Sequence, residues 1–141
     1  MPALTVPVQV RFADIDVFNH VNNVAYFALM ETARLQFLRE HHRSFVGHIV
    51  VARSECDYKK EIRGGTRWVD VTVTVESVGR TSFVIRHDLY VADELMAVGR
   101  TVQVVLDGDR NKRLITDEER AFLLADEDAA PRLDHPSPRR S

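Results

Sequence analysis

The sequence predicts an α+β fold in which one long helix lies along a curved antiparallel sheet. Only one long stretch has the composition of a helix, while several segments alternate apolar and polar residues. Turns of about two residues join the later segments, and such short turns connect antiparallel strands. A helix of about 20 residues is roughly 30 Å long, and a strand of about 11 residues spans roughly 36 Å. The helix can therefore run along the whole sheet. A doubly wound fold is excluded because helices do not alternate with strands.

The N-terminal half is predicted to supply an edge strand, a loop and the long helix. Residues 5–12 (TVPVQVRF) form the strand, which Pro7 confines to an edge because proline has no backbone N–H. A loop rich in Asp and Asn follows. The helix, over residues 22–42, begins at an asparagine cap and has an apolar first half, VAYFALM. One sheet does not cover a helix that is apolar on nearly all sides, so we expect a homodimer or a tetramer of dimers.

The C-terminal half is predicted to consist mostly of strands. The segment WVDVTVTVESV alternates valine with polar residues, which is typical of a strand with one buried face. Thr116 and Glu119 have the spacing of a capping box, which predicts a short helix ending near Leu124. The four strands expected in this half cover residues 48–58, 68–78, 81–92 and 95–106.

Length, composition and charge restrict the functions that this chain can have. The 141 residues, 45% of them hydrophobic, suit one domain, which we place at residues 1–125. Residues 126–141 are rich in proline and poor in large aliphatic side chains, which predicts a disordered tail. A net charge of −2 argues against a nucleic acid partner. The sequence contains no window of about 18 uncharged apolar residues, so no membrane span is predicted. The single cysteine, Cys56, fits a reducing compartment, so we expect the protein in the cytoplasm.

The loop before the long helix carries the candidate chemistry. Asp14 and Asp16 lie in a turn that leads into the helix N-terminus, where unpaired backbone N–H groups can polarise a carbonyl. A carboxylate beside such donors has what acyl transfer needs, because it can attack the carbonyl carbon or activate water. The alternative is that both aspartates only cap turns.

The same loop and helix start resemble the signature of hotdog-fold acyl-CoA thioesterases, within the 4-hydroxybenzoyl-CoA thioesterase-like group. That group shows R-x-x-D-x-D-x-x-x-H-x-N-N-x-x-Y, followed on the helix by E-x-x-R. The resemblance implies the hotdog fold and the hydrolysis of an acyl-CoA thioester to a carboxylic acid and free CoA. Every position of the pattern is filled, by Arg11, Asp14, Asp16, His20, Asn22, Asn23, Tyr26, Glu31 and Arg34.

The resemblance also implies roles for individual residues. Asp16 is the expected catalytic carboxylate, as nucleophile or as general base for water, and the backbone N–H near Asn23 polarises the thioester carbonyl. Asn22 or Asn23 orients water or caps the helix. His20 contacts the substrate or holds the loop, and Tyr26 lines the acyl pocket or packs in the core.

Coenzyme A carries phosphates, which require basic residues and backbone donors. One candidate is the turn Gly79, Arg80, Thr81 and Ser82, which resembles a G-x-x-S segment of the family near the nucleotide. The other is the basic stretch 59–67, opposed only by one acid, with Lys59, Lys60, Arg63 and Arg67. Either segment could instead be an ordinary solvated surface.

Two alternatives to acyl-CoA hydrolysis stay open. One is a non-catalytic module that binds acyl-CoA or acyl-carrier protein, which would share the pocket but not the need for Asp16. The other is a thioesterase acting on acyl-carrier protein, an acidic partner that the basic stretch 59–67 also suits. None of these functions requires a metal ion or a redox cofactor.

Overall fold

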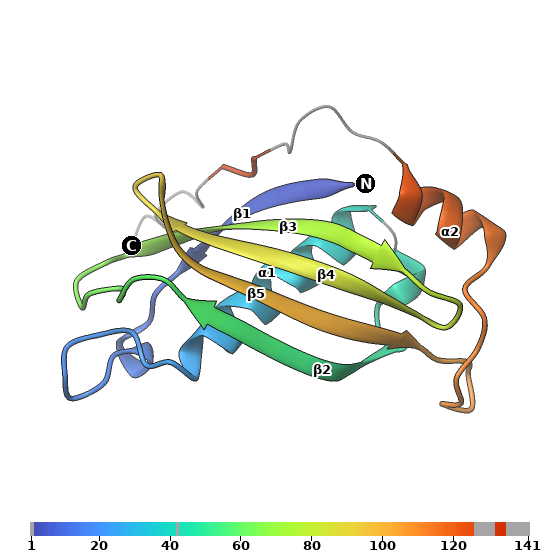
Figure 1. The fold of residues 1–141 in the computed structure, drawn as a ribbon, viewed down its shortest axis with the longest axis horizontal. Helices are drawn as coiled ribbons and strands as arrows, with labels where there is room; N and C mark the ends of the chain where they lie inside the picture. The colour runs from blue at the N-terminus through green and yellow to red at the C-terminus, as the bar shows by residue number, and fades with distance from the viewer. Residues whose placement is uncertain (1, 42, 126–131, 135–141) are drawn as a thin grey trace, which may run out of the picture.

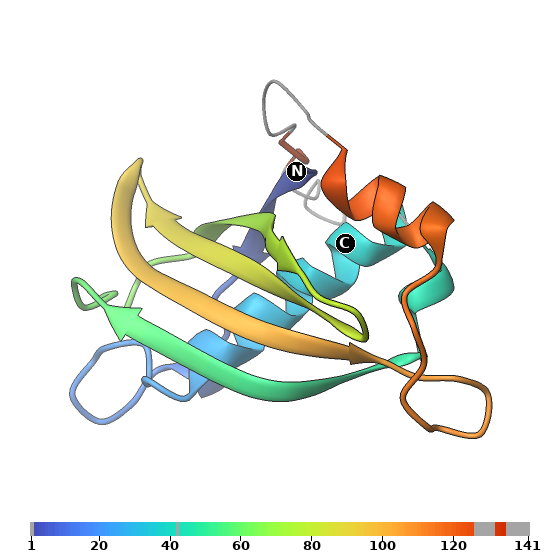
Figure 2. The same ribbon diagram turned by 45° about the vertical axis from the view of Figure 1, so that its right-hand side comes forward.

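The computed structural model describes residues 2–41, 43–125 and 132–134. In this part of the chain, one antiparallel sheet of five strands curves around a long helix (Figures 1 and 2). The strand order is β1-β3-β4-β5-β2, which is the predicted α+β arrangement. No helix among these residues has the length and apolar character needed to cross a membrane. The elements are β1 (Ala3–Gln9), α1 (Ala25–His41), β2 (Ile49–Tyr58), β3 (Trp68–Val78), β4 (Ser82–Val91), β5 (Glu94–Val105) and α2 (Asp117–Leu124), with short 3-10 turns at Phe12–Asp14 and Arg43–Phe45.

The loop that precedes the long helix begins earlier and ends later than the sequence predicts. At each end, hydrogen bonds between a side chain and the nearby backbone turn the chain. The first strand ends at Gln9, since Arg11 and Asp14 form a reciprocal pair in which the Arg11 backbone N–H donates to the Asp14 carboxylate at 2.8 Å. The long helix begins at Ala25 rather than at residue 22. The Asn22 side-chain oxygen accepts a hydrogen bond from the Val24 N–H at 2.9 Å, which closes a non-helical turn first.

The hydrophobic core lies between α1 and the concave face of the sheet. Alternate residues of β3 point at the helix and are fully buried, as the valine alternation predicted. The helix is amphipathic rather than buried all round, because Ala28 and Glu31 are exposed to solvent. Its buried face consists of Tyr26, Leu29, Met30, Ala33, Arg34, Phe37 and Leu38.

The two edges of the sheet differ in how they are covered. The outer edge of β1 receives residues 132–134, where the Leu133 N–H donates to the Thr5 carbonyl at 2.9 Å and Arg132 pairs with Asp70 at 2.5 Å. This part of the predicted tail therefore packs on the domain, while residues 126–131 and 135–141 lie outside the described residues. The outer edge of β2 pairs with no other strand in the described part of the chain, and most of its side chains are exposed.

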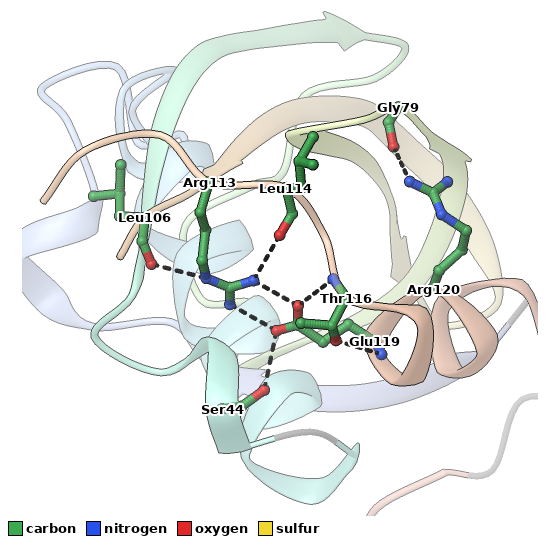
Figure 3. Close-up of polar contacts among 8 residues, drawn as sticks. All are labelled: Ser44, Gly79, Leu106, Arg113, Leu114, Thr116, Glu119 and Arg120. Atoms are coloured by element: carbon green, nitrogen blue, oxygen red, sulfur yellow. Dashed lines mark hydrogen bonds and ion pairs between the residues drawn. The ribbon is translucent and has the colours of Figure 1, made fainter. Parts of the chain in front are cut away.

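A partly buried ion pair fastens α2 to the end of the sheet (Figure 3). The Arg113 guanidinium donates to both oxygens of the Glu119 carboxylate at 2.7 Å. The predicted capping box is present, because the Thr116 N–H donates to Glu119 at 2.9 Å and the Glu119 N–H donates to the Thr116 hydroxyl at 3.1 Å. Hydrogen bonds from Arg113 and Thr116 lower the pKa of Glu119 to about 2. The carboxylate thus stays charged although the residue is only 3% exposed.

Candidate active site

The carboxylate of Asp16 is held in place by its own loop. One of its oxygens, Oδ1, accepts hydrogen bonds from the Phe18 N–H at 2.9 Å and the His20 N–H at 3.3 Å. Asn19 reverses the chain between them with a φ of 60°, in the left-handed region that asparagine tolerates. The second oxygen, Oδ2, accepts no hydrogen bond from the residues that the structure describes. It is therefore free to act on a substrate or on water.

A distant segment, residues 61–64, clamps this loop through the backbone. The Val21 N–H donates to the Ile62 carbonyl, and the Gly64 N–H donates to the Asn19 carbonyl, both at 2.7 Å. Gly64 suits this close approach, because a Cβ there would lie 1.9 Å from the Asn19 side-chain oxygen and would displace that side chain. The clamp fixes the loop against the body of the protein.

The loop, the start of α1 and the end of β2 border an open cavity of about 310 Å³. The predicted catalytic residues Asp16, His20 and Asn23 all line it, together with Tyr26, Lys59 and Lys60. A second cavity of about 390 Å³ shares Lys60 and adds Arg63. The full lining of the first cavity, hereafter the Asp16 cavity, is Asp16, His20, Val21, Asn23, Tyr26, Tyr58, Lys59, Lys60 and Glu61.

One backbone N–H just before α1, that of Asn23, has no hydrogen-bond partner among the described residues, and Asn23 is exposed. Its carbonyl is held by the Tyr58 hydroxyl, which donates to it at 2.8 Å. Asn22 instead closes the turn before the helix, through its bond with the Val24 N–H. Of these two asparagines, Asn23 is the one that lines the cavity.

Tyr26 belongs both to the core and to the cavity wall. It is 3% exposed, and its hydroxyl oxygen accepts a hydrogen bond from the Ile62 N–H at 3.3 Å. Its ring meets that of Tyr58 edge to face, with centroids 4.8 Å apart. Burial raises the pKa of the Tyr26 hydroxyl, which remains neutral at physiological pH. The two tyrosines form an aromatic side of the cavity.

An acid that the sequence did not single out lies beside His20. The Nε2 atom of His20 is 2.9 Å from a carboxylate oxygen of Glu61. In the sequence, Glu61 was only the one negative charge within the basic stretch 59–67. Its pairing depends on how residues 61–64 dock against the loop, and no local pattern signals that contact.

The two segments predicted to bind coenzyme A, the basic stretch 59–67 and the turn 79–82, lie far apart within one chain. Lys60 is paired with Glu94 from the β4–β5 turn, and Arg63 lies 3.8 Å from Glu61, so the basic stretch is less positive than its own sequence indicates. The turn at 79–82 lies at the opposite end of the sheet. One strand of about 11 residues, roughly 36 Å, separates it from the Asp16 cavity. Two of its backbone carbonyls accept hydrogen bonds from α2 and from the segment before α2. The Gly79 carbonyl accepts from the Arg120 guanidinium at 2.8 Å, and the Arg80 carbonyl accepts from the Ile115 N–H at 2.9 Å.

Two other titratable groups, Cys56 and His87, are unsuited to catalysis near neutral pH. Burial raises the pKa of the Cys56 thiol to about 11, which leaves it protonated and weakly nucleophilic. Burial, aided by the charge of Arg34, lowers the pKa of His87 to about 3, so this core histidine is neutral. Among residues 2–41, 43–125 and 132–134, no three His, Cys, Asp or Glu side chains gather as metal ligands would.

A fixed carboxylate, an unpaired N–H at a helix start and a cavity that holds both are the parts that acyl transfer needs. A family model described as the thioesterase-like superfamily matches residues 10–131. The chain belongs to this superfamily and is a thioester hydrolase with the hotdog fold. The predicted fold and family are thereby confirmed.

Relatives of known structure share most of the chain. A thioesterase from Thermus thermophilus, solved in complex with coenzyme A and Zn, is 34% identical with a TM-score of 0.77, covering 85% of this chain and 90% of that one. A predicted thioesterase from Bacillus stearothermophilus is 26% identical with a TM-score of 0.74, covering 86% and 93%. The uncharacterized protein YsmA of Bacillus subtilis is 28% identical, covering 83% of this chain and 82% of that protein.

Proposed function

We propose that the protein hydrolyses acyl-CoA thioesters to a carboxylic acid and free CoA in the Asp16 cavity. The observation that supports this most is the pairing of a carboxylate with one free oxygen, Asp16, and a free backbone N–H, Asn23, in one cavity. The coenzyme A bound by the Thermus thermophilus thioesterase supports CoA as the leaving group. We place the reaction in the cytoplasm, as expected from the single free cysteine, Cys56.

In the proposed reaction the carbonyl oxygen of the thioester accepts a hydrogen bond from the Asn23 N–H. This hydrogen bond stabilises the negative charge that develops on the oxygen. Asp16 acts in one of two ways. Its Oδ2 attacks the carbonyl carbon and forms a mixed anhydride that water then hydrolyses, or it takes a proton from a water molecule that attacks directly. In both cases the C–S bond breaks and its electron pair moves to the sulfur of CoA.

The walls of the cavity suggest where the two halves of the substrate lie. The aromatic side made by Tyr26 and Tyr58 suits an apolar or aromatic acyl group. Lys59 and Lys60 lie at the polar side, and Arg63 lines the neighbouring cavity, so the CoA phosphates are assigned to this rim.

We assign the protein a homodimer built by antiparallel pairing of two β2 edges. The β1 edge is partly covered by residues 132–134, whereas β2 exposes its edge and the valines Val50 and Val51. A twofold axis at β2 sets the Tyr58 end of one strand beside the Ile49 end of the other. The second copy's turn 79–82 then lies at the same end of the joined sheet as the Asp16 cavity. The two groups of predicted CoA residues thus meet only between two chains.

Charges on the β2 edge test this assembly. The double variant Val50→Lys, Val51→Lys is expected to be monomeric in light scattering and to lose most thioesterase activity, because lysines on an edge strand oppose its pairing with a second strand. Leu124→Lys is the matched control, since Leu124 is 46% exposed on α2, away from this edge. It should keep the mass and activity of the unaltered protein. A fully active monomer, altered or not, would refute the assignment.

The substrate class is tested with a panel of acyl groups presented on CoA and on acyl-carrier protein. We expect release of free thiol from acyl-CoA, at a rate that depends on the acyl group. Hydrolysis of the carrier-protein thioesters alone would indicate a carrier-protein thioesterase instead. Tight binding of acyl-CoA with no release of thiol would indicate a non-catalytic binding module.

A further inference from the structure

The contact between His20 and Glu61 has no part in the reaction as described so far. Both side chains line the Asp16 cavity, and their Nε2 and Oε2 atoms are 2.9 Å apart. The other oxygen of Glu61 faces Arg63 at 3.8 Å. Glu61 thus directs one oxygen to the histidine and one to a nearby cation, and it lies on the border of the two cavities.

Backbone pairing sets this contact. His20 and Arg63 form an isolated antiparallel bridge, so the segments that carry His20 and Glu61 run side by side. Ile62, the next residue, is completely buried, which leaves Glu61 on the cavity side. The His20 N–H also donates to Asp16 at 3.3 Å. The histidine is therefore tied at its backbone to the catalytic carboxylate and at its ring to Glu61.

Stability does not account for the pair. The side chains of His20 and Glu61 are 39% and 51% exposed, and ion pairs this open to water contribute little to folding. Their substitution is therefore expected to leave the fold intact. The pair can instead position the histidine for proton transfer. A carboxylate that accepts a hydrogen bond from one ring nitrogen leaves the other ring nitrogen available for proton transfer.

We propose that His20 is the general acid of the reaction and that Glu61 is its positioning residue; this proposal rests on the proposed thioesterase function. Glu61 accepts the Nε2–H of the imidazolium and balances its charge, so the Nδ1–H is the proton that can be given away. When the C–S bond breaks, its electron pair moves to sulfur and the Nδ1 proton follows, giving the neutral CoA thiol.

The proton lost by His20 is replaced within the same turnover. If Asp16 forms an anhydride, the water that hydrolyses the anhydride gives one proton to Nδ1 as its oxygen bonds to the carbonyl carbon. If Asp16 activates water directly, Asp16 holds that proton and returns it to Nδ1 through solvent. In both routes the second proton of the water stays on the carboxylic acid and passes to solvent when that acid ionises. The turnover therefore ends with a thiol, a carboxylate and a protonated His20.

The leaving group provides the test, because a good leaving group needs no acid. The probes are one acyl group carried by N-acetylcysteamine, an alkyl thiol, and by thiophenol, whose thiolate leaves far more readily. For His20→Gln we expect a loss of kcat/KM of about a hundredfold on the alkyl thioester and less than about fivefold on the phenyl thioester. Glu61→Gln should show the same pattern with about a tenfold loss on the alkyl thioester, and Glu61→Asp should recover part of it.

Glu118→Gln, a change of an exposed acid on α2, is the matched control and should alter neither rate. Equal losses on both thioesters in the His20 and Glu61 variants would overturn the acid role while leaving the proposed function in place. Full activity of both variants on the alkyl thioester would also overturn it. If the unaltered protein hydrolysed acyl-CoA and neither probe, the same variants would be compared on acyl-CoA, where undiminished rates would refute the role. Failure of the unaltered protein on every thioester would refute the proposed function itself.

Discussion

Asp16→Asn is expected to lower kcat for acyl-CoA hydrolysis by a factor of about 10² to 10⁴, the range of catalysis by a positioned acid or base. An amide neither attacks a thioester carbon effectively nor takes a proton from water. The fold should not change, because the amide oxygen of the new side chain can still accept from the Phe18 and His20 N–H groups as Oδ1 of Asp16 does. Steady-state kinetics and thermal unfolding of the same preparations measure both effects.

Asp14→Asn should show the opposite pattern and serves as the control. Asp14 is 2% exposed and accepts hydrogen bonds from the Arg11 backbone and guanidinium at 2.8 Å. Although burial raises the pKa of Asp14, the hydrogen bonds and charge of Arg11 outweigh it and hold that pKa below its usual value. We expect Asp14→Asn to lower stability by about 1–2 kcal/mol, as for a lost charged hydrogen bond. Activity per folded molecule should stay near that of the unaltered protein. The reverse assignment would follow if the change at Asp14, and not the change at Asp16, abolished turnover.

Glu119→Gln is expected to lower the free energy of unfolding by about 2–3 kcal/mol, because it removes the buried carboxylate of a partly buried ion pair. The Arg113 guanidinium that Glu119 neutralises would keep its charge with no carboxylate beside it (Figure 3). Denaturant unfolding at pH 7 measures the loss. Glu118→Gln, on the exposed neighbour, is the matched control and should change stability by less than about 0.5 kcal/mol.

The same pair predicts how stability depends on pH. The pKa of Glu119 falls from 4.5 to about 2 on folding, so its contribution is complete above the ordinary pKa and disappears as pH falls toward 2. The difference in unfolding free energy between the unaltered protein and Glu119→Gln should therefore be constant above about pH 5 and shrink below it. A difference that stayed constant down to pH 2 would show that the ion pair is not its source.

The elements that the sequence predicts best are those whose signals are local. The strands expected at 68–78, 81–92 and 95–106 are observed at Trp68–Val78, Ser82–Val91 and Glu94–Val105. Alternation and short turns specify such strands without knowledge of the rest of the fold. The start of α1 was less predictable, because the Asn22 side chain bonds to the Val24 N–H and closes a turn before the helix.

The candidate site divides in the same way. Asp16, His20 and Asn23 could be grouped from the sequence because one short loop carries all three into one cavity. Glu61 could not be assigned to this group from the sequence, because it lies 41 positions after His20 and contacts it only when the two segments dock together. Glu94, which neutralises Lys60, depends in turn on the register of β4 and β5. The roles predicted for the turn 79–82 stay predictions, since they require a second chain.

The most direct test of the central claim is the release of free thiol from a panel of acyl-CoAs by the unaltered protein and by Asp16→Asn, at equal concentrations of folded protein. We predict release of CoA by the unaltered protein with at least one acyl group, and a rate at least about a hundredfold lower with Asp16→Asn. Equal rates from the two proteins, with Asp16→Asn shown to be folded, would contradict the assignment of Asp16 as the catalytic carboxylate.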